Sequence, residues 1–257
     1  MAESSPMRNG TLRSRAYPTL TPASGKYGPQ PRAIVRVIVA VAASVVLTSV
    51  ADAQQTIFNV PSADVLEAGK LYLEEDNLWR PGRPEDTYFT LRAVAGLGSA
   101  VEAGVNLGGL VAEGRSVPNA ILALKWQPLH TSQWSLTAGV HGQFFLRGSA
   151  DGSPSGHAYA HTAWTPVDGT RVTAGVWYAS SGYADTGVTK GVLAGFEQHL
   201  SPTLVFQADW YSGQSALGYF TPGFAWTIGQ WVIYAGYSVK NGDSHENAAL
   251  IEFGRYL

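Results

Sequence analysis

Histidine is the side chain in this sequence best suited to metal binding or to proton transfer near neutral pH. His141 and His161 lie on two neighbouring segments in which apolar and polar residues alternate. If Arg147 pairs with Ser155 across the intervening loop, the same register places His141 opposite His161. Two facing imidazoles can bind a metal or sense pH, but the pattern supplies no third ligand. Hydrogen bonding is the commoner role for such histidines, so we predict no metal site.

The sequence contains no set of residues with the order or spacing of a catalytic site. A nucleophile, a base and a group that orients the base do not occur together. The glycine-rich stretch at 104–109 lies within an alternating segment, whereas a phosphate-binding loop joins a strand to a helix. We therefore predict no catalytic residues, no cofactor and no enzyme activity.

The other charged and imidazole side chains share one face of the alternating segments. Along 99–108, Glu102 and Asn106 are in phase with each other and out of phase with Val101 and Val105. Side chains on such a face can line a polar pathway, or they can pair with one another and fill the interior of a barrel. The candidates for lining the lumen are Glu74, Asp76, Arg92, Glu102, Lys125, His141, Arg147, His161, Glu197, His199, Asp209 and Glu252.

These side chains are positioned by segments of roughly ten residues with a period of two, separated by Gly, Pro, Ser and Asp. Such alternation is typical of strands with one apolar face and one polar face. The links between segments are alternately short and longer, as in an up-and-down barrel. We predict an all-β fold, a transmembrane up-and-down antiparallel β-barrel of about twelve strands. The expected strands are 70–79, 87–97, 99–110, 117–127, 132–147, 155–166, 169–181, 188–200, 202–212, 216–228, 230–240 and 246–257.

Alternation alone does not distinguish a membrane barrel from a soluble sandwich or a lipocalin-like barrel, because it does not say which face is outside. Charged residues make up only 14% of the chain, which is low for a soluble surface. Tryptophans cluster at the ends of the segments, and amphipathic indole rings favour the headgroup layer of a membrane. We predict that an interfacial girdle is formed by Trp79, Trp126, Trp134, Trp164, Trp210, Trp226 and Trp231, whereas Trp177 is in phase with the polar face.

Two local features depend on these face assignments. In the hairpin at 225–234, a turn at Ile228 and Gly229 places Trp226 opposite Trp231, with both rings outward. Glu74 and Glu75 are adjacent, so one of them should point outward, and a bulge or a position at the interface would be needed to place it.

The first 53 residues are expected to be absent from the mature fold. Arg32 and Arg36 precede an uncharged apolar run at 37–50, which ends in the A-D-A sequence at 51–53. This arrangement is typical of a cleaved secretory signal peptide, and the run is shorter than the roughly 20 residues of a transmembrane helix. A single helical turn capped by Ser62 is expected soon after the cleavage site. The predicted division is an N-terminal extension and signal peptide at 1–53, a periplasmic segment at 54–69 and an outer-membrane barrel at 70–257.

The composition excludes two other classes of protein. The chain has no cysteine, so it is not a disulfide-stabilised secreted domain. After residue 53 acidic residues outnumber basic ones, so the chain lacks the basic surface of a nucleic-acid-binding protein.

Both ends of the expected mature chain resemble bacterial outer-membrane proteins. The segment from Thr56 to about Glu75 resembles the mature start of porin-like outer-membrane barrels, and the segment at 248–257 resembles their C-terminal strand. Those strands typically finish with an aromatic residue, whereas this chain finishes with Leu257 and has Phe253 in phase. The resemblance implies a location in the bacterial outer membrane, contact with its lipids and insertion by the barrel-assembly machinery.

Passive, porin-like passage of small hydrophilic solutes is the function that this fold predicts. A non-conducting structural or surface-interaction barrel, acting through loops at 148–154 and 182–187, is the first alternative. An outer-membrane enzyme is the second, because some twelve-stranded barrels are phospholipases. That resemblance would need a His-x-Ser-Asn-Gly-like arrangement, which the sequences at 141–143 and 157–159 do not match.

Overall fold

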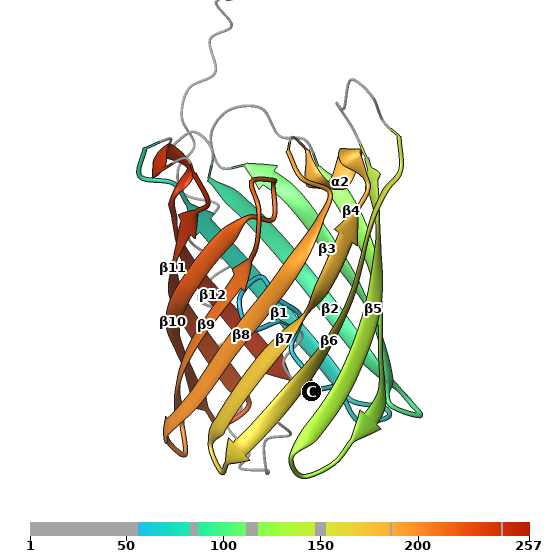
Figure 1. Ribbon diagram of the computed structural model, residues 1–257, viewed down its shortest axis with the longest axis vertical. Helices are drawn as coiled ribbons and strands as arrows, with labels where there is room; N and C mark the ends of the chain where they lie inside the picture. The colour runs from blue at the N-terminus through green and yellow to red at the C-terminus, as the bar shows by residue number, and fades with distance from the viewer. Residues whose placement is uncertain (1–55, 83–86, 112–117, 147–152, 186, 243) are drawn as a thin grey trace, which may run out of the picture. The chain divides into compact units, whose positions relative to one another are not determined.

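The computed structural model describes residues 56–82, 87–111, 118–146, 153–185, 187–242 and 244–257, which form a closed barrel of twelve strands (Figure 1). Each strand is antiparallel to both of its neighbours in the barrel. Within the described residues, no helix is long and apolar enough to cross a membrane. The elements are β1 (Leu71–Trp79), β2 (Tyr88–Gly98), β3 (Val101–Val111), β4 (Asn119–His130), β5 (Trp134–Phe145), β6 (Ser155–Val167), β7 (Thr170–Ala179), α2 (Ser181–Ala184), β8 (Lys190–Ser201), β9 (Leu204–Tyr211), β10 (Tyr219–Ile228), β11 (Trp231–Lys240), η2 (Ser244–Glu246) and β12 (Ala248–Tyr256).

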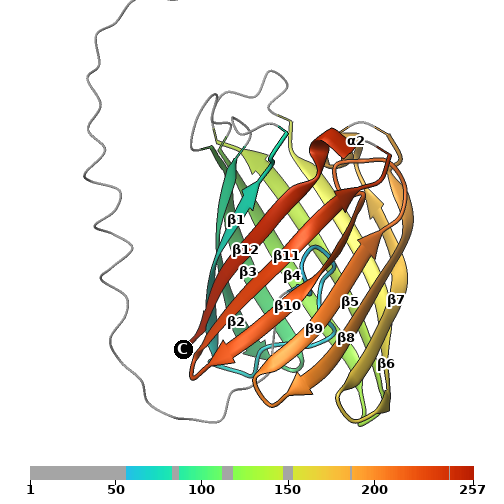
Figure 2. The same cartoon turned by 90° about the vertical axis from the view of Figure 1, so that its left-hand side faces the viewer.

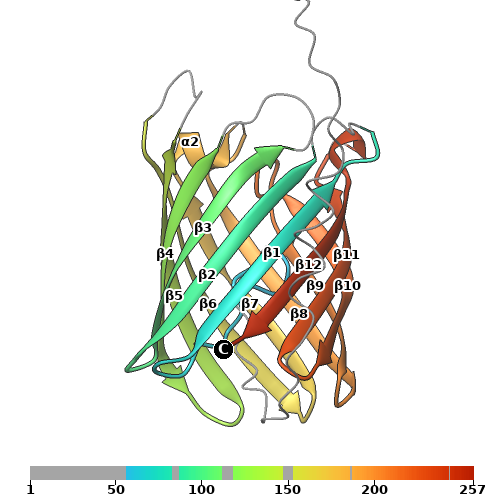
Figure 3. The same cartoon turned by 180° about the vertical axis from the view of Figure 1, so that it is seen from behind.

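The barrel closes where its first strand meets its last. β1 pairs with β12 over a continuous register from Tyr72 opposite Tyr256 to Trp79 opposite Ala249 (Figure 3). Closure leaves the sheet without a free edge, which is what allows strands to cross lipid. The predicted fold and strand number are therefore confirmed.

The links between strands differ at the two ends of the barrel. At one end, β2–β3, β4–β5, β6–β7, β8–β9 and β10–β11 are joined by two or three residues, while the links at the other end contain seven to ten (Figure 2). In the β2–β3 link, Ser99 and Ala100 have φ of 51° and 59°, as the central residues of a type I′ turn do. We refer to the two ends as the short-link end and the long-loop end.

The outer face of the barrel is apolar. Leu73, Leu122, Val140 and Val176 lie on four different strands, and each exposes 45–58% of its surface. A soluble protein does not present so continuous an apolar belt to water, whereas a membrane barrel presents it to lipid.

The tryptophans of the predicted girdle lie on this outer face. Trp134 and Trp164 are opposite each other on β5 and β6, with stacked rings whose centroids are 5.8 Å apart. Trp177 instead points inward and is 3% exposed. Trp231 is half-buried, and the guanidinium of Arg255 lies 5.1 Å from the centroid of its ring. The remaining rings are 36–52% exposed and belong to Trp79, Trp126, Trp210 and Trp226.

The predicted register of the β10–β11 hairpin is wrong by two residues. Ile228 pairs with Trp231, and Trp226 pairs with Ile233 rather than with Trp231. The turn is Gly229-Gln230, because Gly229 adopts a φ of 62° that glycine accepts without steric cost. A shift of two residues preserves the face of every side chain, so Trp226 still points outward.

The adjacent glutamates are separated by ordinary strand alternation. Glu74 is buried in the interior, and Glu75 is exposed on the outer face between Leu91 and Phe253. The register of β1 is continuous on both sides, so no bulge is needed.

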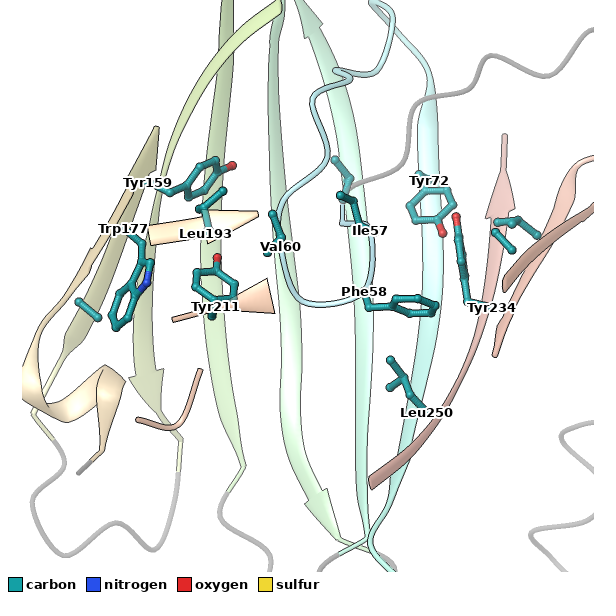
Figure 4. Packing of buried hydrophobic residues seen from close by; sticks show 14 of the residues in the cluster. Ile57, Phe58, Val60, Tyr72, Tyr159, Trp177, Leu193, Tyr211, Tyr234 and Leu250 are labelled. Carbon is teal, nitrogen blue, oxygen red and sulfur yellow. The ribbon is translucent and has the colours of Figure 1, made fainter. Parts of the chain in front are cut away.

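Residues 56–66 of the segment before β1 lie inside the barrel, whereas the sequence predicts a periplasmic segment at 54–69; residues 67–69 are exposed. Residues 56–66 run through the lumen, where Ile57 and Val60 are completely buried (Figures 1 and 4). No helical turn forms near Ser62; Thr56 and Pro61 instead form an isolated antiparallel bridge. We call residues 56–66 the plug. The predicted signal peptide lies outside the described residues and stays a prediction.

Candidate functional site in the barrel interior

A single carboxylate on the barrel wall holds the first half of the plug. Asp209 of β9 accepts hydrogen bonds from the backbone N–H groups of Phe58, Asn59 and Val60, at 2.9, 2.5 and 2.6 Å. The Asn59 side chain donates to Asp209 at 3.3 Å and to Thr221 at 2.8 Å. Three converging backbone donors are a favourable environment for a buried carboxylate, because they replace its water. This contact fixes the depth at which the plug sits.

The second half of the plug is held by β3, β4 and β5. The carbonyl oxygen of Ala63 accepts hydrogen bonds from Gln127 at 2.5 Å and from Thr137 at 3.0 Å. The backbone N–H of Leu66 donates to Glu102 at 2.8 Å. The plug is thus tied to several strands through its own backbone.

The plug is also held by charge. The Arg171 guanidinium on β7 bonds Asp64 of the plug at 2.6 Å and Glu197 of β8 at 2.6 Å. Lys125 of β4 lies 3.3 Å from the Ser62 hydroxyl and 2.8 Å from Glu102. These ion pairs satisfy charges that would otherwise face an open lumen.

Glycines in the wall make room for the apolar side chains of the plug. A Cβ atom at Gly195 would collide with Ile57, and one at Gly223 would collide with the ring of Phe58. Phe58 packs edge-on against Tyr234, with ring centroids 6.5 Å apart (Figure 4). The lumen is therefore shaped to accept this segment.

A second charged group lies where β1, β2 and β12 meet. Arg92 bonds Glu74 at 2.6 Å and Asp76 at 2.8 Å, and the Tyr72 hydroxyl donates to Glu74. Glu252 of β12 lies opposite Asp76 in the strand register. We call Glu74, Asp76, Arg92 and Glu252 the seam cluster. Each of its three carboxylates offers an oxygen within 4.8 Å of those of the other two, a spacing that can hold a metal ion.

The histidine pair differs from the predicted one by four residues. His141 faces His157 across β5 and β6, while His161 faces Thr137. The two Nδ1 atoms are 3.4 Å apart, and His141 Nδ1 is 3.2 Å from the Tyr183 hydroxyl. The predicted register assumed too short a loop between β5, which ends at Phe145, and β6.

Tyr183 lies in α2, at the long-loop end, and its ring stacks on His157 with centroids 5.3 Å apart. Burial raises the pKa of the Tyr183 phenol above its ordinary value, because the phenolate would lose its water. Tyr183 therefore stays protonated over the physiological range and can serve His141 as a hydrogen-bond partner. The two imidazoles and the Tyr183 phenol thus form one group of side chains within hydrogen-bonding distance of one another.

Two cavities of the interior reach towards different ends of the barrel. The larger, about 380 Å³, is lined by plug residues Thr56 and Asn59 and extends to Arg80 and Tyr219 near the long-loop end. The smaller, about 60 Å³, includes Thr227 and Tyr256 near the short-link end. The plug contacts β9 at Asp209 and at Gln207, which lines the smaller cavity. The plug therefore lines the larger cavity and binds a wall residue of the smaller one.

The predicted lumen residues occupy different parts of this interior. Arg147 lies outside the described residues, and His199 is exposed beside the smaller cavity. His161 is 2% exposed and stacks on Tyr159. The others belong to the plug contacts, the seam cluster or the histidine pair: Glu74, Asp76, Arg92, Glu102, Lys125, His141, Glu197, Asp209 and Glu252.

Sequence reasoning missed three residues that matter here. Arg171 and His157 are each in phase with inward-pointing neighbours, so strand alternation could have identified both. Gln207, which donates to the Ile57 carbonyl at 2.5 Å, is also in phase with Asp209. The plug itself has no periodic signal.

Comparison with known proteins bears on the fold. No protein-family model and no curated protein sequence matches the chain. Among solved structures, the chain is similar to the KdgM porin, at 7% identity and a TM-score of 0.54, over 72% of this chain and 97% of that one. It is also similar to the NanC porin, at 13% identity and a TM-score of 0.51, over 71% of this chain and 97% of that one. At these identities the likeness concerns the barrel fold.

Proposed function

We propose that this protein is a bacterial outer-membrane channel for small hydrophilic solutes, and that its own N-terminal plug holds it closed. The observation that carries the proposal is the plug, which polar and charged groups of the wall bind inside the lumen. The wall groups that bind the plug are charged or polar side chains of the kind that line aqueous pores. A plug held by hydrogen bonds and ion pairs, and joined to the barrel at Gly69 and Lys70, can leave without breaking the wall.

Several further observations support this proposal. The apolar outer belt and the tryptophans at its edges fit an outer-membrane location. The porin fold of the similar structures fits a channel. The proposal includes no catalytic activity: His141 and His157 face each other and Tyr183 rather than a serine.

A non-conducting structural barrel is the second candidate, and the plug is also the observation that favours it. Ile57, Val60 and Leu66 are 0–4% exposed, so removing the plug would expose apolar surface to the lumen. In a channel, the plug leaves the lumen while the barrel wall stays folded. In a structural barrel, the plug stays in the lumen as long as the wall is folded.

The experiment that separates them is single-channel recording of the refolded protein in a planar bilayer. Asp209→Asn removes the charge that attracts three backbone N–H groups, so we expect more frequent openings than in the wild type. Asp168→Asn, at the exposed β6–β7 link, makes the same change away from the plug and should leave the openings unaltered.

A cysteine pair at Asn59 and Thr221 tests the plug directly, because the chain has no other cysteine. We expect the oxidised pair to abolish openings and reduction to restore them. Heat-dependent mobility on gels shows whether each variant has folded into a barrel. If the Asp209→Asn variant and the reduced cysteine variant are folded by this measure and carry no current, the channel proposal is contradicted.

A further inference from the structure

Three carboxylates converge at the seam of the barrel, where its first strand meets its last. Glu74 and Asp76 come from β1, and Glu252 comes from β12. Their side-chain oxygens approach within 4.8 Å of one another. All three residues are buried, with 5%, 9% and 2% of their surfaces exposed.

One guanidinium serves this group, and it leaves some oxygens without a partner. Arg92 binds Oε1 of Glu74 and Oδ2 of Asp76, while Tyr72 donates to Oε2 of Glu74. In the described part of the chain, no donor reaches Oδ1 of Asp76 or Oε2 of Glu252, although both atoms are buried. Buried acceptors are normally paired, so two such atoms in one cluster indicate a missing partner.

The charge of the cluster indicates the same missing partner. If all three carboxylates are ionised, one guanidinium leaves two negative charges uncompensated in an interior where such charge is costly. A partner that removes this cost must carry positive charge and accept oxygen ligands.

We propose that Glu74, Asp76 and Glu252 bind one hard divalent cation, of which Ca²⁺ is the representative. Hard divalent cations prefer carboxylate oxygens and complete their coordination with water. The cavity of about 380 Å³ reaches both Asp76 and Glu252, so it supplies a path for the ion and space for its water ligands. The ion would join β1 to β12 and thereby stabilise the closure of the barrel.

The test compares thermal unfolding of the refolded full chain in EDTA and in Ca²⁺. We expect Ca²⁺ at about 100 times its Kd to raise the Tm by roughly 5–10 °C, because the ion binds only the folded state. Tb³⁺ serves as a second probe, and its luminescence should be sensitised by Tyr72, which lies beside Glu74.

Glu252→Gln is the decisive variant, and Glu75→Gln is its matched control. Glu75 neighbours two of the ligands in sequence but points to the outer face. We expect Glu252→Gln to abolish both the Ca²⁺ shift and the Tb³⁺ signal, and to raise the Tm in EDTA because it removes a buried charge. Asp76→Asn should also abolish the increase in Tm caused by Ca²⁺. This second variant tests the proposal if Glu252→Gln does not refold.

Two results would overturn the proposal. One is a wild-type protein with neither a Ca²⁺ shift nor Tb³⁺ luminescence, since protons would then neutralise the cluster. The other is loss of the response in Glu75→Gln, which would place the ion on the outer face. Neither result bears on whether the plug opens, so this proposal and the channel proposal can fail separately.

Discussion

The seam cluster and the Glu102–Lys125 pair are both buried charged groups on the barrel wall, but they differ in balance. Glu102 and Lys125 form one ion pair at 2.8 Å, and each side chain is 4% exposed. In the seam cluster, Arg92 is shared between Glu74 and Asp76, and Glu252 adds a third carboxylate. The two groups occupy similar surroundings with different net charge.

This difference assigns different roles to the two groups. The Glu102–Lys125 pair combines one positive and one negative group, and its remaining hydrogen-bonding capacity holds the plug at Leu66 and Ser62. The seam cluster needs a cation, and it lies where the barrel closes. Net charge, more than the number of contacts, therefore distinguishes a group that completes the interior from one that recruits a ligand.

Among the variants proposed below, Arg92→Met should cause the largest loss of stability. The variant leaves three buried carboxylates without a guanidinium, and we expect the free energy of unfolding to fall by about 5 kcal/mol in EDTA. Urea unfolding in lipid vesicles, followed by tryptophan fluorescence, measures this loss. Ca²⁺ should recover part of the stability, and a loss that Ca²⁺ leaves unchanged would contradict the role assigned to the cluster.

Lys125→Met tests the balanced pair. It leaves Glu102 buried beside the plug, and we expect a loss of about 3–4 kcal/mol in the same urea experiment. Because the Glu102–Lys125 pair is not a cation site, Ca²⁺ should restore none of this stability. Lys190→Met, at the exposed start of β8, is the matched control and should change the free energy of unfolding little. Rescue of Lys125→Met by Ca²⁺ would erase the distinction between the two groups.

Gly195→Ala tests how closely the wall fits the plug. The added Cβ collides with Ile57, and we expect overpacking to weaken plug docking by about 2 kcal/mol and to increase channel openings. The double variant Gly195→Ala with Ile57→Val removes the colliding methyl group and should return openings toward the wild-type frequency. If the double variant opens as often as the single one, the collision is not the cause.

Thr137→Val should have the smallest effect. It removes one of the two hydrogen bonds to the Ala63 carbonyl and leaves the bond from Gln127. We expect a loss of about 1 kcal/mol, measured as a shift in the urea midpoint. A loss as large as that of Lys125→Met would mean that this half of the plug is held by hydrogen bonds rather than by charge.

The faces of the strands could be predicted from the sequence, but their registers could not. Period-two alternation assigned Glu74, Asp209 and Glu252 to the interior, where the structure places them. Both register errors, two residues at Trp226 and four at His141, are even numbers. An even shift leaves every side chain on its own face, so the hydrophobic pattern cannot detect it.

The plug could not be predicted for a different reason. Its residues follow no period, and its position is set by backbone N–H groups that bind Asp209 from 149–151 residues away. Every residue except proline has such a donor, so the contact leaves no mark on the sequence. The sequence identified Asp209 as an inward-pointing carboxylate, but it did not show that the plug backbone binds there.

The closure of β1 on β12 also sets an order of assembly. The plug immediately precedes β1, and the wall around it is complete only after β12, the last strand in the chain, has paired with β1. Contacts between such distant parts of a chain form slowly, because a long loop must close first. The plug, which is synthesised before the strands, is therefore enclosed only when β12, the last strand, pairs with β1. The pairing of this one strand both completes the wall and encloses the plug.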